Sequence, residues 1–248
     1  PDLGRVGMDE VATVLSAIGE RVDVPLIVDA DTGYGNALNV MRTVKLFERN
    51  GASVIQLEDQ NLPKRCGHLS GKTLVSPAEM MGKIKAAQDA RRSPDTLIMA
   101  RTDAIAVEGI DAALDRAERY HEAGADILFV EAPRDVNEMR KVTARLGDKA
   151  PLLANMVEGG KTPILPANEL QKIGYSVVIF PGGLARAVGH LMGRYFASLR
   201  THGDTAPFRA QMIDFDEMNA LIGTPEMLAD GARFDAGNFE TDDTDIGD

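Results

Sequence analysis

The sequence predicts an α/β fold in which strands and helices alternate along the chain. Short apolar runs rich in β-branched residues have the length and composition of buried parallel strands. Between them lie segments whose apolar residues recur with the 3.6-residue period of a helix. Several of these segments end at a glycine just before the next strand, for example Gly51, Gly124 and Gly174. Glycine adopts a left-handed helix cap at little cost, so this repeated construction indicates a parallel sheet.

The expected elements follow one another in a regular order. Strands are expected at 26–28, 53–57, 97–99, 127–130, 151–153 and 176–180. Helices are expected at 8–18, 38–49, 77–91, 110–121, 136–146 and 184–199. A further short apolar helix within 208–228 would pack onto the fold or onto a neighbouring subunit.

The number of strands bears on the kind of parallel sheet. A closed parallel barrel has eight strands, whereas six are visible here. The chain begins at Pro1, without methionine, and enters a helix almost at once. We therefore expect a (β/α)8 barrel of the TIM type whose first two strands are absent at the N-terminus. The alternative is an open, doubly wound sheet of six strands, but no glycine-rich phosphate loop follows the first strand.

The domain organisation follows from length and composition. A chain of 248 residues suits one α/β barrel or two small domains. We favour a single barrel domain with C-terminal helices over residues 1–234. The tail at 235–248 is acidic and poor in apolar residues, and we expect it to be disordered.

Charge and cysteine content exclude several classes of partner. The net charge of −11 argues against nucleic acid and anionic membranes, which need a basic surface. No apolar run is long enough for a membrane span, and no leader is visible. One cysteine excludes an internal disulfide and a cysteine-based zinc site, so a reducing compartment, the cytoplasm, is expected. Small anionic substrates are compatible with this charge if local cations or a metal bind them.

The only cysteine lies in a segment rich in cations, Lys64-Arg65-Cys66-Gly67-His68. Positive charges beside a thiol favour its reactive form, and glycine allows a ligand to approach the backbone closely. The sequence therefore predicts that Cys66 is a working thiol and that Lys64, Arg65 and Gly67 contact the substrate. His68 is expected to act as a general acid or base, or as an electrostatic partner of the thiol.

Polar and charged residues recur at the carboxyl ends of the expected strands. They are Asp29 and Asp31, Glu58 and Asp59, Arg101 and Asp103, Glu131, and Asn155. In a parallel barrel these ends converge on one mouth, where active sites lie. Each residue alone would be interpreted as a solvated strand end, but their succession predicts a shared site.

The carboxylates in this set suggest a divalent metal. Asp29 and Asp31 are two residues apart and would project from the same side of a strand. Two like charges held together favour a shared cation, and hard oxygen ligands suit Mg2+ or Mn2+. Only one of Glu58 and Asp59 can face the same mouth, and we choose Glu58. The predicted metal ligands are thus Asp29, Asp31 and Glu58.

Arg101 and Asp103 also share one side of their strand. The guanidinium could clamp a substrate carboxylate through two parallel hydrogen bonds. Alternatively, Arg101 and Asp103 form an internal ion pair.

Taken together, these segments resemble the isocitrate lyase and phosphoenolpyruvate mutase superfamily. The matching motifs are PDLG at 1–4, VDADTGYG at 28–35, EDQ at 58–60, PKRCGH at 63–68, ARTDA at 100–104, EA at 131–132 and NMVEGGKTP at 155–163. The likeness covers about residues 1–200 in order and register. The family's Ser-Gly-rich substrate loop on the second barrel strand has no counterpart here, in keeping with the expected absence of two strands.

The resemblance implies a fold and a set of roles. The family fold is a (β/α)8 barrel, often with the last helix exchanged between the subunits of a dimer or tetramer, so a homo-oligomer is expected. The catalytic residues it implies are Cys66, His68, Arg101 and Glu131, with Cys66 as the acid/base thiol. The substrate-binding residues it adds are Asp2, Asn155 and Thr162. Asp29 would bind Mg2+ directly, and Asp31 and Glu58 would hold it through water.

The resemblance also implies an activity. It is Mg2+-dependent cleavage of a carbon–carbon bond in a 2-hydroxy di- or tricarboxylate, such as 2-methylisocitrate or 2,3-dimethylmalate, to pyruvate and a carboxylic acid. Hydrolysis of oxaloacetate and carboxyphosphonoenolpyruvate mutase chemistry are alternatives on the same site. A barrel that only binds dicarboxylates is the alternative without catalysis.

Overall fold

The computed structural model describes residues 3–67 and 69–239. The chain forms two compact units, Pro1–Gly183 and Leu184–Asp248, and each is described by itself. The expected single domain over residues 1–234 stays a prediction.

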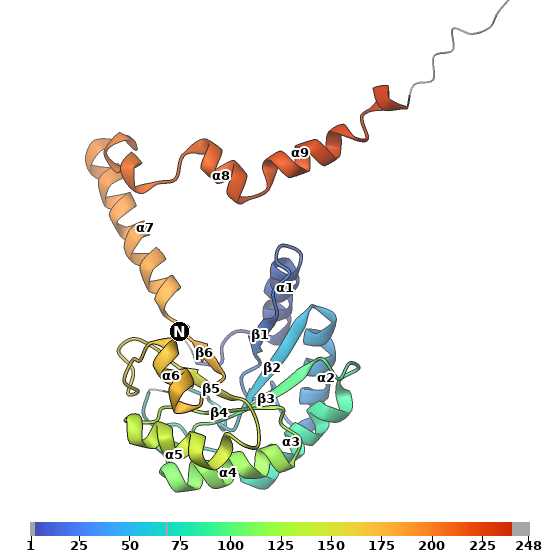
Figure 1. Ribbon diagram of the computed structural model, residues 1–248, viewed down its shortest axis with the longest axis vertical. Coiled ribbons are helices and arrows are strands. Elements are labelled where there is room, and N and C mark those ends of the chain that lie inside the picture. The colour runs from blue at the N-terminus through green and yellow to red at the C-terminus, as the bar shows by residue number, and fades with distance from the viewer. Residues whose placement is uncertain (1–2, 68, 240–248) are drawn as a thin grey trace, which may run out of the picture. The chain divides into compact units, whose positions relative to one another are not determined.

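The first unit is built on a parallel sheet of six strands in the described part of the chain (Figure 1). The strands are β1 (Leu26–Asp29), β2 (Ala52–Glu58), β3 (Leu97–Thr102), β4 (Ile127–Val130), β5 (Leu152–Asn155) and β6 (Val177–Ile179). The helices are α1 (Met8–Gly19), α2 (Ala37–Arg49), α3 (Pro77–Ala90), α4 (Ile110–Glu122), α5 (Val136–Leu146) and α6 (Ala167–Ile173).

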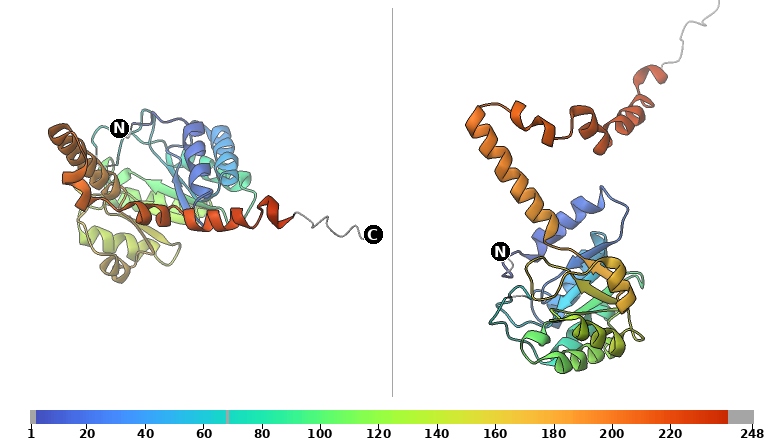
Figure 2. Two further views of the ribbon diagram at one scale, coloured as in Figure 1. Left: turned by 90° about the horizontal axis from the view of Figure 1, so that it is seen from above. Right: turned by 60° about the vertical axis from the view of Figure 1, so that its left-hand side comes forward.

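The strands lie side by side in the order of the sequence, with β1 and β6 at the two edges of the described sheet. The sheet curls into half of a barrel, and helices α2 to α6 cover its convex face (Figures 1 and 2). This sequential parallel order is that of a (β/α) barrel and confirms the expected fold class. A doubly wound sheet would reverse its strand order, so that alternative is wrong.

The helix boundaries follow the capping residues in the sequence. Asn36 begins α2 by accepting hydrogen bonds from the backbone N–H groups of Leu38 and Asn39, and Ser76 begins α3 in the same way. The three glycines expected to end helices have positive φ angles, 97° at Gly51, 111° at Gly124 and 118° at Gly174. Those predicted boundaries are therefore confirmed.

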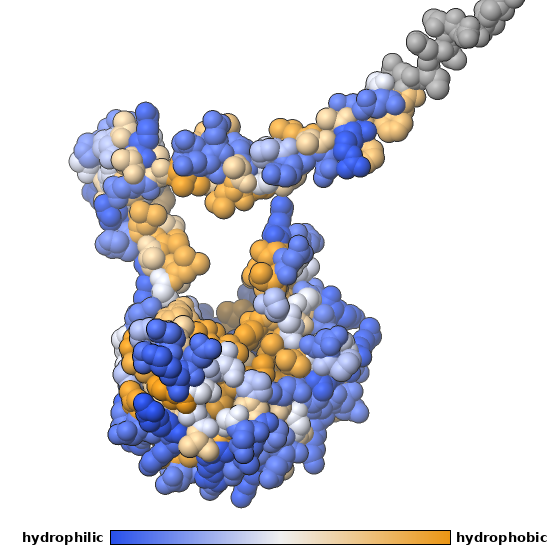
Figure 3. Space-filling view, viewed as in Figure 1, coloured by the Kyte–Doolittle hydropathy of each residue, from blue (hydrophilic) through white to orange (hydrophobic). Residues whose placement is uncertain are grey.

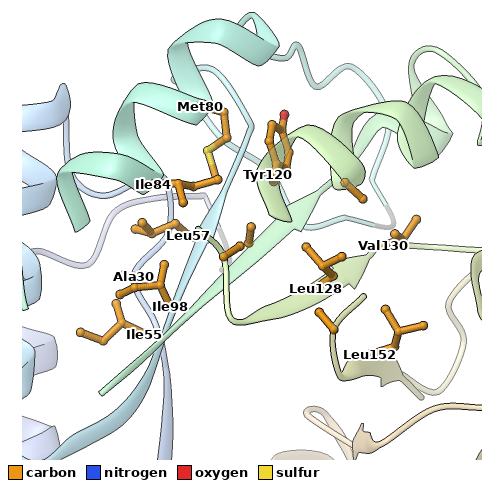
Figure 4. Close-up of a cluster of buried hydrophobic side chains, with 14 of the residues drawn as sticks. Ala30, Ile55, Leu57, Met80, Ile84, Ile98, Tyr120, Leu128, Val130 and Leu152 are labelled. Atoms are coloured by element: carbon orange, nitrogen blue, oxygen red, sulfur yellow. The ribbon is translucent and has the colours of Figure 1, made fainter. Parts of the chain in front are cut away.

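The strands place alternate residues on two faces of the sheet. One face packs against the helices in a large apolar core, which includes Ile55, Leu57, Ile98, Leu128 and Leu152 (Figure 4). The opposite, concave face carries a smaller cluster of Val54, Met99, Ile127, Phe129 and Leu153. Beyond this cluster, the same face continues into the polar residues at the carboxyl ends of the strands.

The second unit contains helical segments. Helix α7 (Gly183–His202) leads into it, followed by a 3₁₀ segment (Ala206–Gln211), α8 (Phe215–Leu221) and α9 (Thr224–Ala232). The expected helix within 208–228 is therefore divided. The Asp214 carboxylate caps a new helix by accepting from the Glu217 N–H, and Gly223, with a φ of 75°, separates α8 from α9.

Large apolar side chains lie exposed along these helices (Figure 3). None of the described helices combines the length and apolar character that a membrane crossing requires. The tail expected to be disordered begins with a short 3₁₀ turn at Ala236–Asn238. Residues 240–248 of that tail lie outside the described residues.

Candidate active site

A cleft of about 470 Å³ opens on the concave face at the carboxyl ends of the strands. It brings together six of the residues predicted from the sequence, Asp29, Cys66, Gly67, Arg101, Glu131 and Asn155. Phe129, Val157 and Ile179 contribute apolar wall. The strand ends therefore form one shared cleft, as their order along the chain predicted.

Arg101 is the central cation of the cleft and is almost fully buried. Its Nε and Nη2 atoms donate to the two carboxylate oxygens of Asp103 at 3.0 and 3.1 Å. Its Nη1 atom lies 3.5 Å from Glu58 Oε2, and the guanidinium lies 5.2 Å from the ring centroid of Phe129. The structure thus shows the internal ion pair that was one interpretation of the sequence. That Arg101 also clamps a substrate carboxylate stays a prediction.

Glu58 ends β2 and faces Arg101 across the β2–β3 pair, where the two residues are in register. Its carboxylate is wholly buried, and neither oxygen has a hydrogen-bond partner among the described residues. Burial raises the pKa of Glu58 to about 8, although the positive charge of Arg101 opposes this shift. A buried carboxylate without hydrogen bonds is costly in a purely structural role.

The two aspartates at the end of β1 do not both belong to the strand. The strand ends at Asp29, and Asp31 has a φ of 48°, so the expectation that they share a strand face is wrong. Instead, the Asp31 N–H donates to Asp29 Oδ1 at 2.9 Å. The Lys64 ammonium lies 2.5 Å from Asp31 Oδ1 and 3.9 Å from Glu58 Oε1. Lys64 is therefore buried between two of the three predicted metal ligands.

Whether these residues fit a divalent cation can be judged from their donor atoms. No group of three or more His, Cys, Asp or Glu side chains converges closely enough to enclose a metal ion within residues 3–67 and 69–239. However, Glu58 offers two buried oxygens without hydrogen bonds, and Asp29, on the neighbouring strand β1, lines the cleft. Hard oxygen donors of this kind suit Mg2+ or Mn2+, so the donor set fits the cation.

Cys66 lies in the loop between β2 and α3, is partly exposed, and lines the cleft. The neighbouring cations have protein partners. Lys64 pairs with Asp31, and Arg65 donates from Nη1 to the Ser70 carbonyl at 2.9 Å. A role for either cation at the substrate stays a prediction.

Gly67 is needed for a close approach. A Cβ atom there would lie 2.6 Å from Glu131 Cγ, 2.7 Å from Arg101 Nη2 and 3.0 Å from Asp103 Oδ1. Any side chain at this position would therefore collide with three buried groups of the cleft. The glycine lets the cysteine loop lie directly against the strand ends.

Glu131 and Asn155 form the far wall of the cleft. Asn155 Nδ2 lies 3.3 and 3.2 Å from the two carboxylate oxygens of Glu131. Thr162 is buried in the following loop, whereas Asp2 and His68 lie outside the described residues. The roles predicted for Thr162, Asp2 and His68 stay predictions.

Several residues that shape the cleft were not assigned to it from the sequence. Phe129 lies two residues before Glu131 on β4, so the two-residue period of a strand could have placed it on the cleft face. Asp103 was counted among the charged strand ends but was given no role of its own beside Arg101. Gln60 and Lys72 bind backbone groups of the cysteine loop, and no local pattern signals such contacts.

Comparisons with known proteins place this fold in a family. The profile of the family described as phosphoenolpyruvate phosphomutase matches residues 1–200. The chain is 48% identical over 223 residues to 2,3-dimethylmalate lyase of Eubacterium barkeri, covering 90% of this chain and 76% of that protein. It is 54% identical over 187 residues to 2-methylisocitrate lyase of Aeropyrum pernix, covering 75% of this chain and 59% of that protein. It thus spans less than two thirds of the Aeropyrum protein.

Solved structures have the same fold. A 2,3-dimethylmalate lyase superposes with a TM-score of 0.86 at 31% identity, covering 96% of this chain and 79% of that one. An oxaloacetate acetylhydrolase in complex with 3,3-difluorooxalacetate gives a TM-score of 0.85 at 31% identity, covering 98% and 80%. A phosphonopyruvate hydrolase in complex with oxalate and Mg2+ gives a TM-score of 0.81 at 30% identity, covering 94% and 81%.

Fold, cleft and relatives together define a (β/α)-barrel enzyme of the carbon–carbon lyase class. The cleft lies at the carboxyl ends of the strands, where barrel enzymes have their active sites. The chain belongs to the phosphoenolpyruvate mutase and isocitrate lyase superfamily.

Proposed function

We propose that this enzyme cleaves a methyl-substituted 2-hydroxy di- or tricarboxylate, such as 2-methylisocitrate or 2,3-dimethylmalate, to pyruvate and a carboxylic acid, with Mg2+ as cofactor. The observation that carries the proposal is that Cys66, Arg101 and Glu131 line one cleft. A thiol next to fixed cations suits protonation of a carbanion-like carbon. Relatives named for both substrates support the substrate class.

The metal would be held by Asp29, Asp31 and Glu58. When bound, Mg2+ would supply the positive charge that stabilises negative charge on the oxygen atoms of the substrate. Mn2+ has similar ligand preferences and could replace it. The buried Glu58 carboxylate without hydrogen bonds supports this assignment, as does the Mg2+ in the related phosphonopyruvate hydrolase.

The side chains of this chain would bind the substrate and move its protons. Arg101, held in place by Asp103, would stabilise the negative charge that develops on the departing fragment. Asn155, Thr162 and His68 would bind a substrate carboxylate, and Asp2 would line the site. Cys66 would deliver a proton to the carbon of that fragment. Glu131 would line the site beside Asn155 and hold its amide in place.

Hydrolysis of oxaloacetate to oxalate and acetate is a second candidate function. It is favoured by the likeness to an oxaloacetate acetylhydrolase, which extends over 98% of this chain. The same cations and thiol loop could receive a hydrated 2-oxo acid. Carboxyphosphonoenolpyruvate mutase chemistry stays a third alternative, because the matching family is described as a phosphomutase, of phosphoenolpyruvate.

Assembly and location belong to the same proposal. We propose a homo-oligomer, a dimer or tetramer in which the C-terminal helix is exchanged. Exposed apolar side chains on α7, namely Leu184, Val188, Leu191 and Phe196, support an interface there. A single cysteine is compatible with the reducing cytoplasm.

The function is tested by incubating the Mg2+-loaded protein with 2-methylisocitrate, 2,3-dimethylmalate and oxaloacetate. Pyruvate from either of the first two supports the lyase, whereas oxalate from oxaloacetate alone supports the hydrolase. Cys66→Ala should abolish lyase turnover while the protein stays folded, because the proton donor is lost. Full lyase turnover by Cys66→Ala would contradict the assigned role of the thiol.

A further inference from the structure

Two buried polar side chains that lie outside the turn at Cys66 determine its position. The Leu69 N–H closes this turn on the Cys66 carbonyl at 2.9 Å. On its N-terminal side, the Arg65 N–H donates to Gln60 Oε1 at 2.9 Å, and Gln60 Nε2 donates to the Arg65 carbonyl at 2.7 Å. Gln60 is 1% exposed, so its amide satisfies both backbone groups of Arg65 away from water.

Lys72 holds the C-terminal side of the same turn. Its Nζ atom donates to the carbonyls of Gly67 and Leu69 and lies 4.0 Å from Asp103 Oδ1. Its side chain is 2% exposed, and burial lowers the pKa of Lys72. Burying an ammonium group is costly unless hydrogen bonds and an opposite charge compensate it. Here the compensating groups are the Gly67 and Leu69 carbonyls of the cysteine turn and the Asp103 carboxylate, which also binds Arg101.

The turn is also in contact with the reacting groups. Gly67 packs so closely on Glu131, Arg101 and Asp103 that it leaves no space for a Cβ atom. Lys72 pairs with the same Asp103 that fixes the guanidinium of Arg101. The position of the thiol and the position of the central cation are therefore coupled through Asp103 and Lys72.

We propose that Gln60 and Lys72 are positioning residues that hold the Cys66 turn against the Arg101–Asp103 pair and thereby fix where the thiol lies in the cleft. Misplacing a catalytic group by about 1 Å can cost a large factor in rate. The expected effect of these residues on turnover rests on the proposed function. Their effect on the position of the thiol does not, because that position can be measured without substrate.

Thiol alkylation measures this position directly. Cys66 is the only cysteine in the chain, so iodoacetamide reports on this one turn. Lys72→Met and Gln60→Leu should each raise the alkylation rate of the folded protein roughly tenfold, equivalent to about 1.4 kcal/mol of lost restraint. Lys83→Met is the matched control, because Lys83 is equally buried but donates to the Thr32 carbonyl in another loop. Its alkylation rate should equal that of the wild type.

The two variants separate restraint from charge. Lys72→Met removes a restraint and a positive charge, whereas Gln60→Leu removes a restraint and leaves the charge. A rise in both variants supports the proposal. If the alkylation rate changes in Lys72→Met alone, Lys72 acts on the thiol through its charge, and the proposal is overturned. Unchanged alkylation rates in both variants would also overturn it. If Lys72→Met loses its circular dichroism spectrum, the milder Lys72→Gln replaces it.

Turnover gives the second measurement. In Lys72→Met, kcat should fall roughly tenfold while KM stays within about twofold, because the thiol acts in the chemical step. Lys72→Arg, which keeps a donor and a charge, should recover part of the loss. Faster alkylation of the variants in a protein that cleaves none of the 2-hydroxy acids would uphold the positioning and reject the proposed function. If the enzyme cleaves a 2-hydroxy acid and both variants keep the wild-type kcat and alkylation rate, the proposed function is upheld and the positioning role is rejected.

Discussion

The Tyr120 hydroxyl donates a hydrogen bond to the Asp59 carboxylate at 2.7 Å, on the face of the sheet opposite the cleft. The same oxygen, Oδ2, accepts from the Thr102 hydroxyl at 2.7 Å, and Oδ1 accepts from the Asp103 N–H at 3.0 Å. Arg116 approaches Oδ2 at 3.4 Å. This buried carboxylate therefore ties α4 to the strand end that carries the Arg101–Asp103 pair.

Asp59→Asn should destabilise the protein by about 3 kcal/mol or more, because an amide nitrogen cannot accept from the donors that converge on the carboxylate. Tyr120→Phe should cost less, about 1.5 to 3 kcal/mol, since it removes the hydrogen bond to Asp59 and a longer one accepted from Arg116 but leaves the carboxylate in place. Urea unfolding of both variants measures the difference. A smaller loss in Asp59→Asn than in Tyr120→Phe would contradict this account of the network.

Gly67→Ala should reduce kcat roughly tenfold or more and destabilise the protein by about 1 to 3 kcal/mol, because the added methyl group collides with buried groups and displaces the cysteine turn from the strand ends. Gly82→Ala is the matched control. Gly82 lies in α3, and a Cβ atom added there would meet no other atom within 4 Å, so alanine should stabilise the helix by about 0.5 to 1 kcal/mol and leave turnover unchanged. Steady-state kinetics and thermal unfolding of both variants check the prediction. Wild-type kcat in Gly67→Ala would show that the loop tolerates displacement.

Acid should weaken the link between Glu108 and Arg116. Arg116 donates to both carboxylate oxygens of Glu108 at 2.8 and 2.7 Å, and these bonds lower the pKa of Glu108 below its ordinary value. A carboxylate with a lowered pKa in the folded state stabilises the protein above its ordinary pKa, and this contribution is lost as pH falls through the lowered value.

Glu108→Gln tests this link. The variant should be less stable than the wild type at neutral pH by about 0.2 to 1 kcal/mol, since the pair is partly exposed to solvent. The difference should shrink as pH falls below about 4.5. Melting temperatures of both proteins across the acid range measure it, and a difference that is independent of pH would refute the assignment.

Asn155→Asp should impair the cleft, because it places a second carboxylate where an amide nitrogen now lies 3.2 Å from Glu131. Two carboxylates at this distance disfavour ionisation of both. We expect kcat/KM to fall roughly tenfold or more for an anionic substrate, and more than in Asn155→Ala, which adds no charge. Kinetics of the two variants side by side decide the point. Equal losses would mean that only the amide hydrogen bond matters.

The sequence predicts most of the fold because its signals are local. Apolar runs, helical periodicity and capping glycines such as Gly124 depend on residues close together in the chain. Strand ends also predict much of the cleft, since parallel strands present Arg101, Glu131 and Asn155 at one edge. These predictions required no knowledge of loop conformation.

Predictions that depend on loop conformation were less successful. Asp31 was expected on a strand face, but its positive φ turns the chain and places its N–H on Asp29. The sequence places Lys64 near the thiol along the chain, but it does not reveal that the ammonium lies between Asp31 and Glu58. Lys72 binds carbonyl groups that any sequence could provide, so only the folded loop identifies it.

The two faces of the sheet can accumulate substitutions independently. Along β2 to β5, one set of alternate side chains packs on the helices, and the other set lines the concave face. A substitution on the concave face can alter which molecule is accepted while the helix packing keeps the protein folded. Such separation explains how proteins named as lyases and hydrolases share this architecture with TM-scores of 0.81 to 0.86. In this superfamily, new chemistry can arise without a new scaffold.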